Sequence, residues 1–255
     1  MSTYPWAAGY IDSDRPKIVT SRFQYDDGYT IERYQATGGY QALRAALGRT
    51  PGEVHEEVKA ANVLGRGGAG FPAGIKWKTV MDASADQKYI CCNADEGDSG
   101  TFADRILMEG DPFTLIEGIA IAGLAVGATK GFIYVRSEYP AAIKTLRRAI
   151  EIAKPRLENF ELKVRVGAGS YVCGEETAML ESIEGKRGVV RAKPPLPALE
   201  GLFGKPTIIN NVLTLASVPE IIASGAASYK ARGVGKSLGT QIFQLAGNIK
   251  QGGIV

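Results

Sequence analysis

The chain has 255 residues, of which 45% are hydrophobic, so it can bury a full core in one large domain or two small ones. Its net charge of +3 is small and no run of Lys and Arg occurs, which gives no electrostatic reason to expect a nucleic acid or an anionic membrane as partner. The longest apolar stretch, 115–128, contains Glu117 and is too short to span a bilayer, and the first residues lack the basic and apolar regions of a signal peptide. We therefore expect a cytoplasmic protein, soluble or on the cytoplasmic side of a membrane complex, without direct membrane insertion.

The single histidine and the three cysteines restrict the chemistry that side chains could perform. His55 lies beside Glu56 on a helix face that reads as charged, so we expect a solvated side chain and no histidine general base, catalytic triad or metal cluster. Cys91, Cys92 and Cys173 have neither a C-x-x-C pair nor the spacing of a zinc or iron–sulfur site. We expect buried thiols and no metal site, and we expect any catalysis to depend on a bound cofactor.

The N-terminal part of the chain predicts an arm and two helices. Residues 1–36 are rich in Tyr, Asp and Arg and are expected to pack as an arm over the domain. Residues 40–47 predict a short helix. A capping-box pattern at 50–53 opens a second helix, expected to extend over 53–64 and to end at Gly65.

A glycine-rich stretch, 65–74, follows this helix and holds five glycines in ten residues. Glycine contributes no side chain, so such a cluster marks either a backbone with positive φ or a ligand lying against the backbone. The stretch satisfies G-x-G-x-x-G, but it follows a predicted helix, whereas the Rossmann pattern requires a strand there. Two interpretations stay open: a helix stop with a mobile loop, or a backbone-amide cradle for a nucleotide, with Arg66 and Lys76 as cations and Phe71 and Trp77 as apolar surfaces.

Strands and helices then alternate. The expected strands are 88–93, 131–136 and 161–166, and the expected helices are 111–126, 140–154 and 174–184. This order predicts an α/β fold with a Rossmann-like parallel sheet flanked by helices, preceded by a short helical N-terminal region. Ligands of such sheets bind beyond the carboxyl ends of the strands, which places the loops 93–101 and 167–176 at a site. The second loop leads into a helix whose free amides would favour an anion such as a phosphate.

The last part of the chain contains an apolar run, 207–212, that ends in Asn210 and Asn211 and precedes a predicted helix at 213–224. The two asparagines fit an ordinary turn or a capped helix start. They fit equally well amides that face a ring or a ribityl chain. A new alternating strand begins at 241–247 and is unfinished at the end of the chain, so we expect a fragment of a longer protein.

Five segments in order carry a resemblance to a known family. They are GRGGAGFPAGIKW (65–77), CNADEGDSGTFADR (92–105), GAGSYVCGEETAMLESIEGKRG (167–188), KPPLPA (193–198) and TIINNVLT (207–214). Together they resemble the NADH-binding, FMN-containing 51-kDa subunit of respiratory complex I and the diaphorase subunits of NAD-dependent formate dehydrogenases and NAD-reducing hydrogenases. The loop 92–105 looks more like the formate dehydrogenase beta subunit, because complex I tends to carry a glutamate followed by proline where Asp98 and Ser99 stand.

The resemblance implies three regions: an N-terminal arm (1–36), an FMN- and NADH-binding α/β domain (37–235) and the start of a truncated β-grasp domain (236–255). By the same resemblance, the glycine loop with Gly65, Gly67 and Gly68 lies under both nucleotides. The positions that match FMN-binding ones are Arg66, Gly67, Lys76, Asn93, Asp95, Glu96, Tyr171, Gly174, Glu175, Asn210 and Asn211. The positions that match NADH-contacting ones are Phe71, Lys76, Asp98, Glu176 and Lys193.

The implied activity is that of a diaphorase, in which a hydride passes directly between NAD(H) and bound FMN without a catalytic side chain. FMN would relay single electrons to iron–sulfur clusters of a larger complex. A [4Fe-4S] cluster is implied for a C-terminal part that this chain does not contain, and the implied partners are a thioredoxin-like [2Fe-2S] subunit and a cluster-rich catalytic subunit. The formate dehydrogenase beta subunit is the favoured parent. The complex I subunit and the hydrogenase diaphorase subunit are the alternatives.

Three departures from the family concern nucleotide recognition. Thr79 and Leu196 stand where an aromatic residue is frequent, and Asp98 is one methylene shorter than glutamate. We expect Asp98 and Glu176 to repel the extra phosphate of NADPH and so to favour NAD.

Two other classes of function remain as alternatives. An ATPase that uses the glycine loop is disfavoured, because Lys76 is not followed by the hydroxyl residue of a P-loop. A non-catalytic nucleotide-binding scaffold would keep the fold without the flavin, and the intact loops at 92–105 and 167–176 argue against it.

Overall fold

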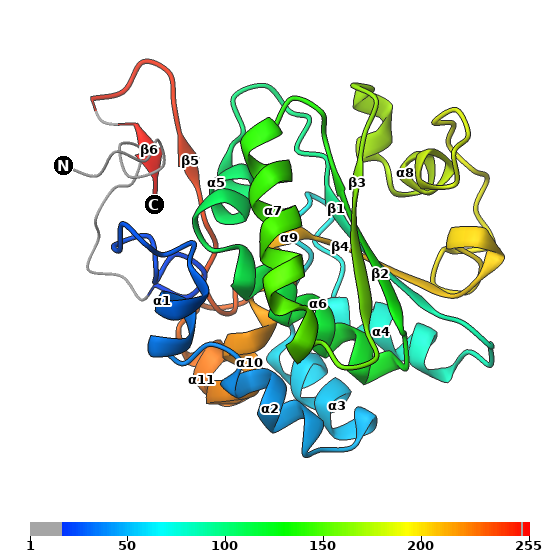
Figure 1. The fold of residues 1–255 in the computed structure, drawn as a ribbon, viewed down its shortest axis with the longest axis horizontal. Coiled ribbons are helices and arrows are strands. Elements are labelled where there is room, and N and C mark those ends of the chain that lie inside the picture. The colour runs from blue at the N-terminus through cyan, green and yellow to red at the C-terminus, as the bar shows by residue number, and fades with distance from the viewer. Residues whose placement is uncertain (1–16, 251) are drawn as a thin grey trace.

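The computed structural model describes residues 17–250 and 252–255. Its central feature is a four-stranded sheet in the order β3-β2-β1-β4 (Figure 1). The strands are β1 (Tyr89–Ala94), β2 (Lys130–Val135), β3 (Glu161–Val166) and β4 (Thr207–Asn211). Every pairing between them is parallel, so all four strands end at the same edge of the sheet.

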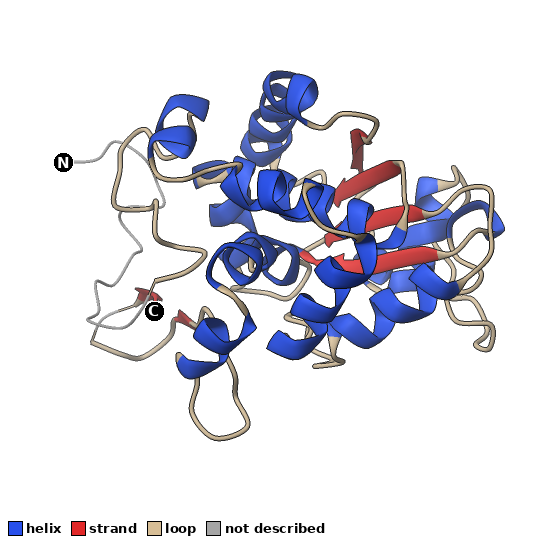
Figure 2. Ribbon diagram, turned by 90° about the horizontal axis from the view of Figure 1, so that it is seen from below, coloured by secondary structure: helices blue, strands red, loops and turns tan. Residues whose placement is uncertain are grey.

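The helices lie on both sides of this sheet (Figure 2). They are α1 (Ile31–Ala36), α2 (Gln41–Leu47), α3 (Pro51–Ala61), α4 (Ala73–Asp82), α5 (Ala103–Gly110), α6 (Pro112–Val126), α7 (Pro140–Ala153), α8 (Glu176–Ile183), α9 (Val212–Ala216), α10 (Val218–Ser224) and α11 (Ala226–Ala231). The predicted α/β fold with a parallel sheet and flanking helices is confirmed.

The central strand β1 and its neighbour β4 are buried almost throughout, as expected of a parallel sheet covered on each side, whereas the edge strand β3 is mostly exposed. Ile90 and Cys92 of β1 point into the main core, which also contains the buried residues of α6 and α7. Cys91 and Tyr134 point the other way, into a smaller cluster with Met179 of α8. The cysteines are therefore buried free thiols, as predicted.

Helix α6 is buried on almost every side, and the sequence specifies both of its ends. Asp111 caps its start by accepting a hydrogen bond from the amide of Thr114, and Pro112 occupies the first helical position. Gly127 ends it with φ of 74°, a left-handed conformation that favours glycine.

Glu117 of α6 fixes the N-terminal helices against the core. Its carboxylate accepts hydrogen bonds from the amide of Tyr40 at 2.9 Å, from the amide of Leu43 at 2.7 Å and from the hydroxyl of Tyr34. Burial raises the pKa of Glu117, and the three donors act in the opposite direction.

The structure corrects the prediction for His55, which is fully buried. Its Nε2 donates a hydrogen bond of 2.9 Å to the carbonyl of Gly74, so it joins α3 to the start of α4. Glu56 is exposed, but His55 lies on the inward stripe of α3 next to Val54 and Val58. The charged residues next to His55 in the sequence lie on another face of the helix, so they did not indicate the environment of His55.

The stop of α3 and two helix starts also differ from the prediction. The capping box at Thr50 is present, but α3 ends at Asn62, which has φ of 51°, and Gly65 is not its stop. Helices α4 and α5 were not predicted, because they are short and begin directly after the glycine-rich and acidic loops. The run before Asn211 is strand β4, and the helix predicted at 213–224 is two helices, α9 and α10, that meet at Ser217.

At the C-terminal end, β5 (Gln244–Leu245) pairs in antiparallel fashion with β6 (Gly253–Ile254). The pairing is shorter than the predicted strand at 241–247. Of the predicted N-terminal arm, residues 1–16 lie outside the described residues, while Ile18 and Phe23 are buried in the main core.

Within 17–250 and 252–255, no helix has the length and apolar character needed to cross a membrane. The same residues contain no group of three or more His, Cys, Asp and Glu side chains placed to hold a metal ion.

Candidate functional site

A cavity of about 1520 Å³ opens beyond the carboxyl ends of the strands. It is larger than the roughly 300–1,000 Å³ of a typical small-molecule pocket, so it has room for more than one ligand of ordinary size. The predicted site residues all line it: Gly65, Arg66, Gly67, Gly68, Phe71, Lys76, Asn93, Asp95, Glu96, Asp98, Tyr171, Gly174, Glu175, Glu176, Lys193, Asn210 and Asn211. Segments far apart in the sequence thus meet around one space.

The glycine loop closes on itself, and its residues 65–69 line the cavity. The amide of Gly65 donates to the carbonyl of Phe71 at 2.9 Å, which joins the two ends of the loop. Gly68 and Gly70 have φ of 103° and 62°, and a Cβ on either would meet no atom within 4 Å. Within the described chain, no backbone amide from Gly67 to Gly70 donates a hydrogen bond. These amides are available to an anionic group, as the cradle interpretation requires.

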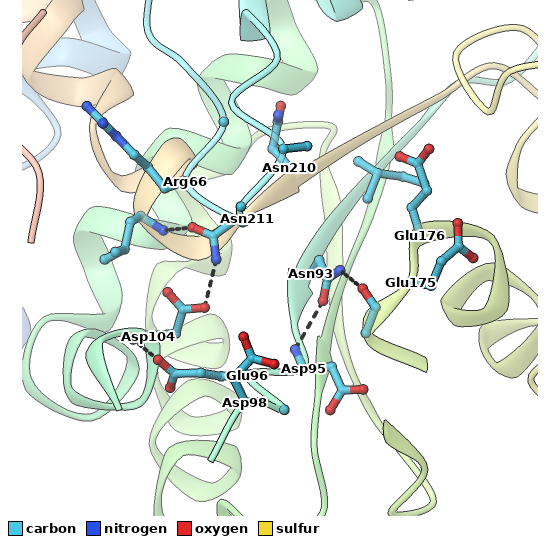
Figure 3. Close-up of a pocket in the computed structure, with 18 of the residues that line it drawn as sticks. Arg66, Asn93, Asp95, Glu96, Asp98, Asp104, Glu175, Glu176, Asn210 and Asn211 are labelled. Atoms are coloured by element: carbon cyan, nitrogen blue, oxygen red, sulfur yellow. Dashed lines mark hydrogen bonds between the residues drawn. The ribbon is translucent and has the colours of Figure 1, made fainter. Parts of the chain in front are cut away.

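Arg66 does not supply the free cation that was expected beside this loop. Its guanidinium donates to Oε1 of Gln241 at 2.6 Å, to the carbonyl of Thr240 at 2.9 Å and to the hydroxyl of Tyr229 at 3.3 Å. Figure 3 shows the side chain directed away from the carboxylates of the cavity. Arg66 therefore ties the glycine loop to the C-terminal segment.

Trp77 was expected to offer an apolar surface to a nucleotide, and this prediction is wrong. The indole is fully buried, because α4 turns this position into the core. Its Nε1 donates to Oδ1 of Asn210 at 2.9 Å, so Trp77 holds a cavity residue without facing the cavity. Phe71 differs, since 45% of its surface is exposed at the cavity wall.

Asn210 and Asn211 end β4 at the floor of the cavity. Asn211 is a helix cap, as one of the two interpretations held: its Oδ1 accepts from the amide of Leu213 at 2.8 Å, at the start of α9. Its Nδ2 donates to Oδ2 of Asp104 at 2.7 Å (Figure 3). Both asparagines also line the cavity, so the capping role and the lining role are compatible.

Asn93 lies near the end of β1, and Asp95 follows the strand directly. Nδ2 of Asn93 donates to the carbonyl of Gly174 at 2.8 Å, which links the end of β1 to the segment after β3 (Figure 3). Burial raises the pKa of Asp95 to about 6, against the opposing effect of Arg136. Asp95, at the edge of the cavity, therefore takes up a proton at a higher pH than an ordinary aspartate.

Glu96 holds the start of α5. Its carboxylate accepts from the amides of Asp104 and Arg105, each at 3.1 Å, and from the hydroxyl of Tyr139 at 3.1 Å. Burial raises the pKa of Glu96, while these donors favour the ionised form.

Glu175 occupies the start of α8, which was expected to have free amides for a phosphate. Its carboxylate accepts from the amides of Thr177 at 2.8 Å and Ala178 at 2.9 Å. The expectation of free amides there is wrong, since a carboxylate of the protein already takes the place of the anion.

Glu176 lies between two lysines. Its carboxylate is 2.8 Å from Nζ of Lys193 and 3.4 Å from Nζ of Lys76. Burial opposes ionisation, but Lys193 and Lys76 outweigh it and lower the pKa of Glu176. Glu176 is therefore an anion at neutral pH, and it holds two cations at the rim of the cavity.

Tyr171 joins the two loops across the mouth of the cavity. Its hydroxyl donates to Oδ1 of Asp98 at 2.7 Å, and its ring covers Gly97, where a Cβ would come within 2.9 Å of the ring. The side chain is 71% exposed, which makes it a flat apolar surface at the entrance.

Sequence reasoning missed two parts of the cavity wall. Asp104 lies within the segment 92–105 but was not singled out. The other part is 241–246, where Oε1 of Gln244 accepts from the amides of Phe102 and Ala103 at the start of α5. No local pattern marks Gln244, because it acts on a helix some 140 positions earlier in the chain.

Comparison with known proteins identifies a family and several similar proteins. The model of the Nuo51 FMN-binding domain matches residues 58–220. A subunit of the NADH-quinone oxidoreductase of Rhizobium meliloti is 49% identical over 248 residues, which cover 93% of this chain and 59% of that protein. NADP-reducing hydrogenase subunit HndC of Solidesulfovibrio fructosivorans is 46% identical, with 98% of this chain and 53% of that protein covered.

Among solved structures, the crystal structure of an NAD+-reducing [NiFe]-hydrogenase in the H2-reduced state is similar, with a TM-score of 0.81 and 37% sequence identity. The match covers 88% of this chain and 40% of that one. This chain thus spans only part of the length of the relatives that it matches.

Proposed function

This chain belongs to the Nuo51 FMN-binding domain family, and from this premise we propose that its cavity binds FMN and NADH and that a hydride passes between them. The observation that carries the proposal is the glycine loop, in which Gly67, Gly68 and Ala69 line the cavity and, within the described chain, their amides donate no hydrogen bond. FMN, when bound, supplies the acceptor of the hydride.

The residues at the cavity fit such ligands. Amides of the glycine loop offer hydrogen bonds to a phosphate, and the two cations at the rim, Lys76 and Lys193, attract anionic groups. Phe71 and Tyr171 expose apolar rings on which a planar ring system stacks. In this arrangement the protein binds and orients the two nucleotides and excludes water between them.

Nucleotide selectivity is assigned to the acidic residues at the rim. Glu176 is ionised, and Asp98 is held by Tyr171 at the entrance. Both would repel the additional phosphate of NADPH, so we assign the chain to NAD.

The names of the relatives support an assignment of the parent complex. They are named as subunits of NADH-quinone oxidoreductase and of hydrogenases, which supports these two alternatives over the formate dehydrogenase beta subunit. We therefore assign the chain to the electron-input module of such a complex, with iron–sulfur subunits as partners and a [4Fe-4S] cluster held by residues that this chain does not contain. The division into 1–36, 37–235 and 236–255 belongs to this proposal, and the β5–β6 pairing supports a β-grasp start in the last region.

The test is reconstitution of the purified chain with FMN, followed by titration with NADH in the absence of oxygen. Bound FMN should show the visible bands of a flavin, and NADH should bleach them. The chain should then reduce ferricyanide with NADH, but it should not act on formate, hydrogen or quinone, because these need other subunits. A folded chain that binds no FMN would refute the proposal and favour the non-catalytic scaffold.

A further inference from the structure

Asp104, in the first turn of α5, is a cavity residue that the proposed function leaves without a role. Only 5% of its surface is exposed, and it lines the cavity beside Asn211. Its Oδ2 accepts the hydrogen bond from Nδ2 of Asn211 at 2.7 Å. Within the described part of the chain, nothing donates to its Oδ1, and no lysine or arginine pairs with it.

The groups around Asp104 do not neutralise a negative charge. Glu96 is a second carboxyl on the loop after β1, and Cys92 of β1 is a buried thiol that burial keeps neutral. The guanidinium of Arg105 lies over the ring of Tyr139, 5.6 Å from its centroid, and forms no ion pair with Asp104. An unpaired carboxylate in such a place is unfavourable, and a carboxyl there takes up a proton instead.

The hydrogen bonds show which of the two neighbouring carboxyls carries the proton. Glu96 accepts from two backbone amides and one hydroxyl, and three donors strongly favour an ionised carboxylate. Asp104 accepts from one neutral amide only. Both carboxyls lie at the N-terminal end of α5, so the helix dipole favours ionisation of both and does not determine which one is protonated. In agreement, burial and the charge of Glu96 raise the pKa of Asp104 well above its usual value.

We propose that Asp104 is a neutral carboxyl at pH 7 whose Oδ2 positions Asn211 and whose Oδ1 hydroxyl donates a hydrogen bond to the ligand. The ligand atom is an acceptor on the edge of a ring system, namely a carbonyl oxygen or an unprotonated ring nitrogen. This inference rests on the proposed function, in which the flavin ring carries such acceptors. The cavity floor then combines an oriented amide from β4 with a carboxylic acid from α5, and it discriminates against ligands that present a donor there.

The protonation state is tested in the ligand-free protein by infrared difference spectroscopy. Wild type minus Asp104→Asn at pH 7 should contain the carbonyl band of a protonated carboxyl. The matched control is wild type minus Glu96→Gln, which should lack that band. Because burial also raises the pKa of Glu109, Asp111 and Glu117, only the difference spectra identify the residue. A band that disappears with Glu96 instead, or with neither, would overturn the assignment.

The donor role is tested by FMN affinity at pH 7. Asp104→Asn keeps a neutral donor and an acceptor in the same shape, so it should bind FMN close to wild-type strength. Asp104→Leu removes both and should bind about tenfold more weakly. Equal affinity in the leucine variant, or a loss in the asparagine variant as large as that in the leucine variant, would contradict the donor role.

If the leucine variant does not fold, the asparagine variant and the infrared spectra still decide: a loss of affinity in Asp104→Asn or a missing band would overturn the proposal. Failure of the wild type to bind FMN would refute the proposed function, and it is distinguishable because the infrared measurement needs no ligand.

Discussion

The variant Gly67→Val tests whether the glycine loop binds a nucleotide or is a simple loop. Gly67 has no positive φ, and among residues 17–250 and 252–255 the only atom that a Cβ there would meet within 4 Å is Cβ of Asn211, at 3.4 Å. The protein itself therefore tolerates the side chain, and the change in stability should stay within about 1 kcal/mol. The added methyl groups instead enter the cavity.

If a nucleotide lies against the loop, a side chain in that space costs about 1–3 kcal/mol of binding free energy. At about 1.4 kcal/mol per factor of ten, FMN or NADH should bind roughly 5- to 150-fold more weakly. The assay is fluorescence titration with FMN and stopped-flow titration with NADH, beside thermal unfolding of the same sample.

Gly74→Ala is the matched control, because Gly74 lies outside the cavity lining. A Cβ there would come within 2.6 Å of Cα of Lys59, where α3 and α4 pack. We expect a loss of about 1–3 kcal/mol in stability, because a backbone must move, and near-normal ligand affinity in the folded protein. Near-normal affinity for both ligands in Gly67→Val would refute the cradle and the role assigned to the glycine loop.

Three further predictions concern carboxylates. Glu176→Gln should improve the use of NADPH relative to NADH by about tenfold, because it removes a like charge and leaves Lys193 with one carboxylate partner, Glu175; an unchanged ratio of kcat/KM would exclude Glu176 as the discriminating residue. The free energy of unfolding of the wild type should fall relative to that of Asp95→Asn as the pH rises from 3.8 to about 6, because the folded state favours the protonated form of Asp95. A constant difference between the two unfolding free energies in urea across that pH range would contradict this. Glu117→Ala leaves the amide of Tyr40 and two other donors without an acceptor and should cost about 3 kcal/mol or more of unfolding free energy in urea, whereas a loss below about 1 kcal/mol would show that water replaces the carboxylate.

The strands β1, β2 and β3 and the longer helices could be predicted because local patterns specify them. The capping residues of α3 and α6, the apolar runs of β1 and β2 and the alternating pattern of β3 are all properties of neighbouring residues. Helices α4 and α5 follow glycine-rich or acidic loops without a strong cap of their own. The backbone amides at the start of α5 donate hydrogen bonds to Glu96 and Gln244, which lie outside the helix.

The site could be predicted as a set of residues but not as a set of contacts. The resemblance and the topological rule for parallel sheets both placed the glycine loop and the two strand-end loops at one site. The orientation of individual side chains could not be predicted from the local sequence. Arg66 points to Gln241, Trp77 points into the core, and His55 is buried. Each of these depends on a partner distant in the chain or on the rotation of a helix.

The strand order β3-β2-β1-β4 has a consequence for the order of assembly. One side of β1 pairs with β2, which follows soon after it, but the other side waits for β4, more than a hundred positions later. A nascent chain that has not yet reached Asn211 leaves that edge of β1 open, and an unpaired edge invites association with other chains. The cavity is incomplete at that stage, because Asn210 and Asn211 of β4 are among the residues that line it. In the proposed function, loading of the cofactor therefore requires synthesis at least through Asn211, and it follows the longest-range pairing of the sheet.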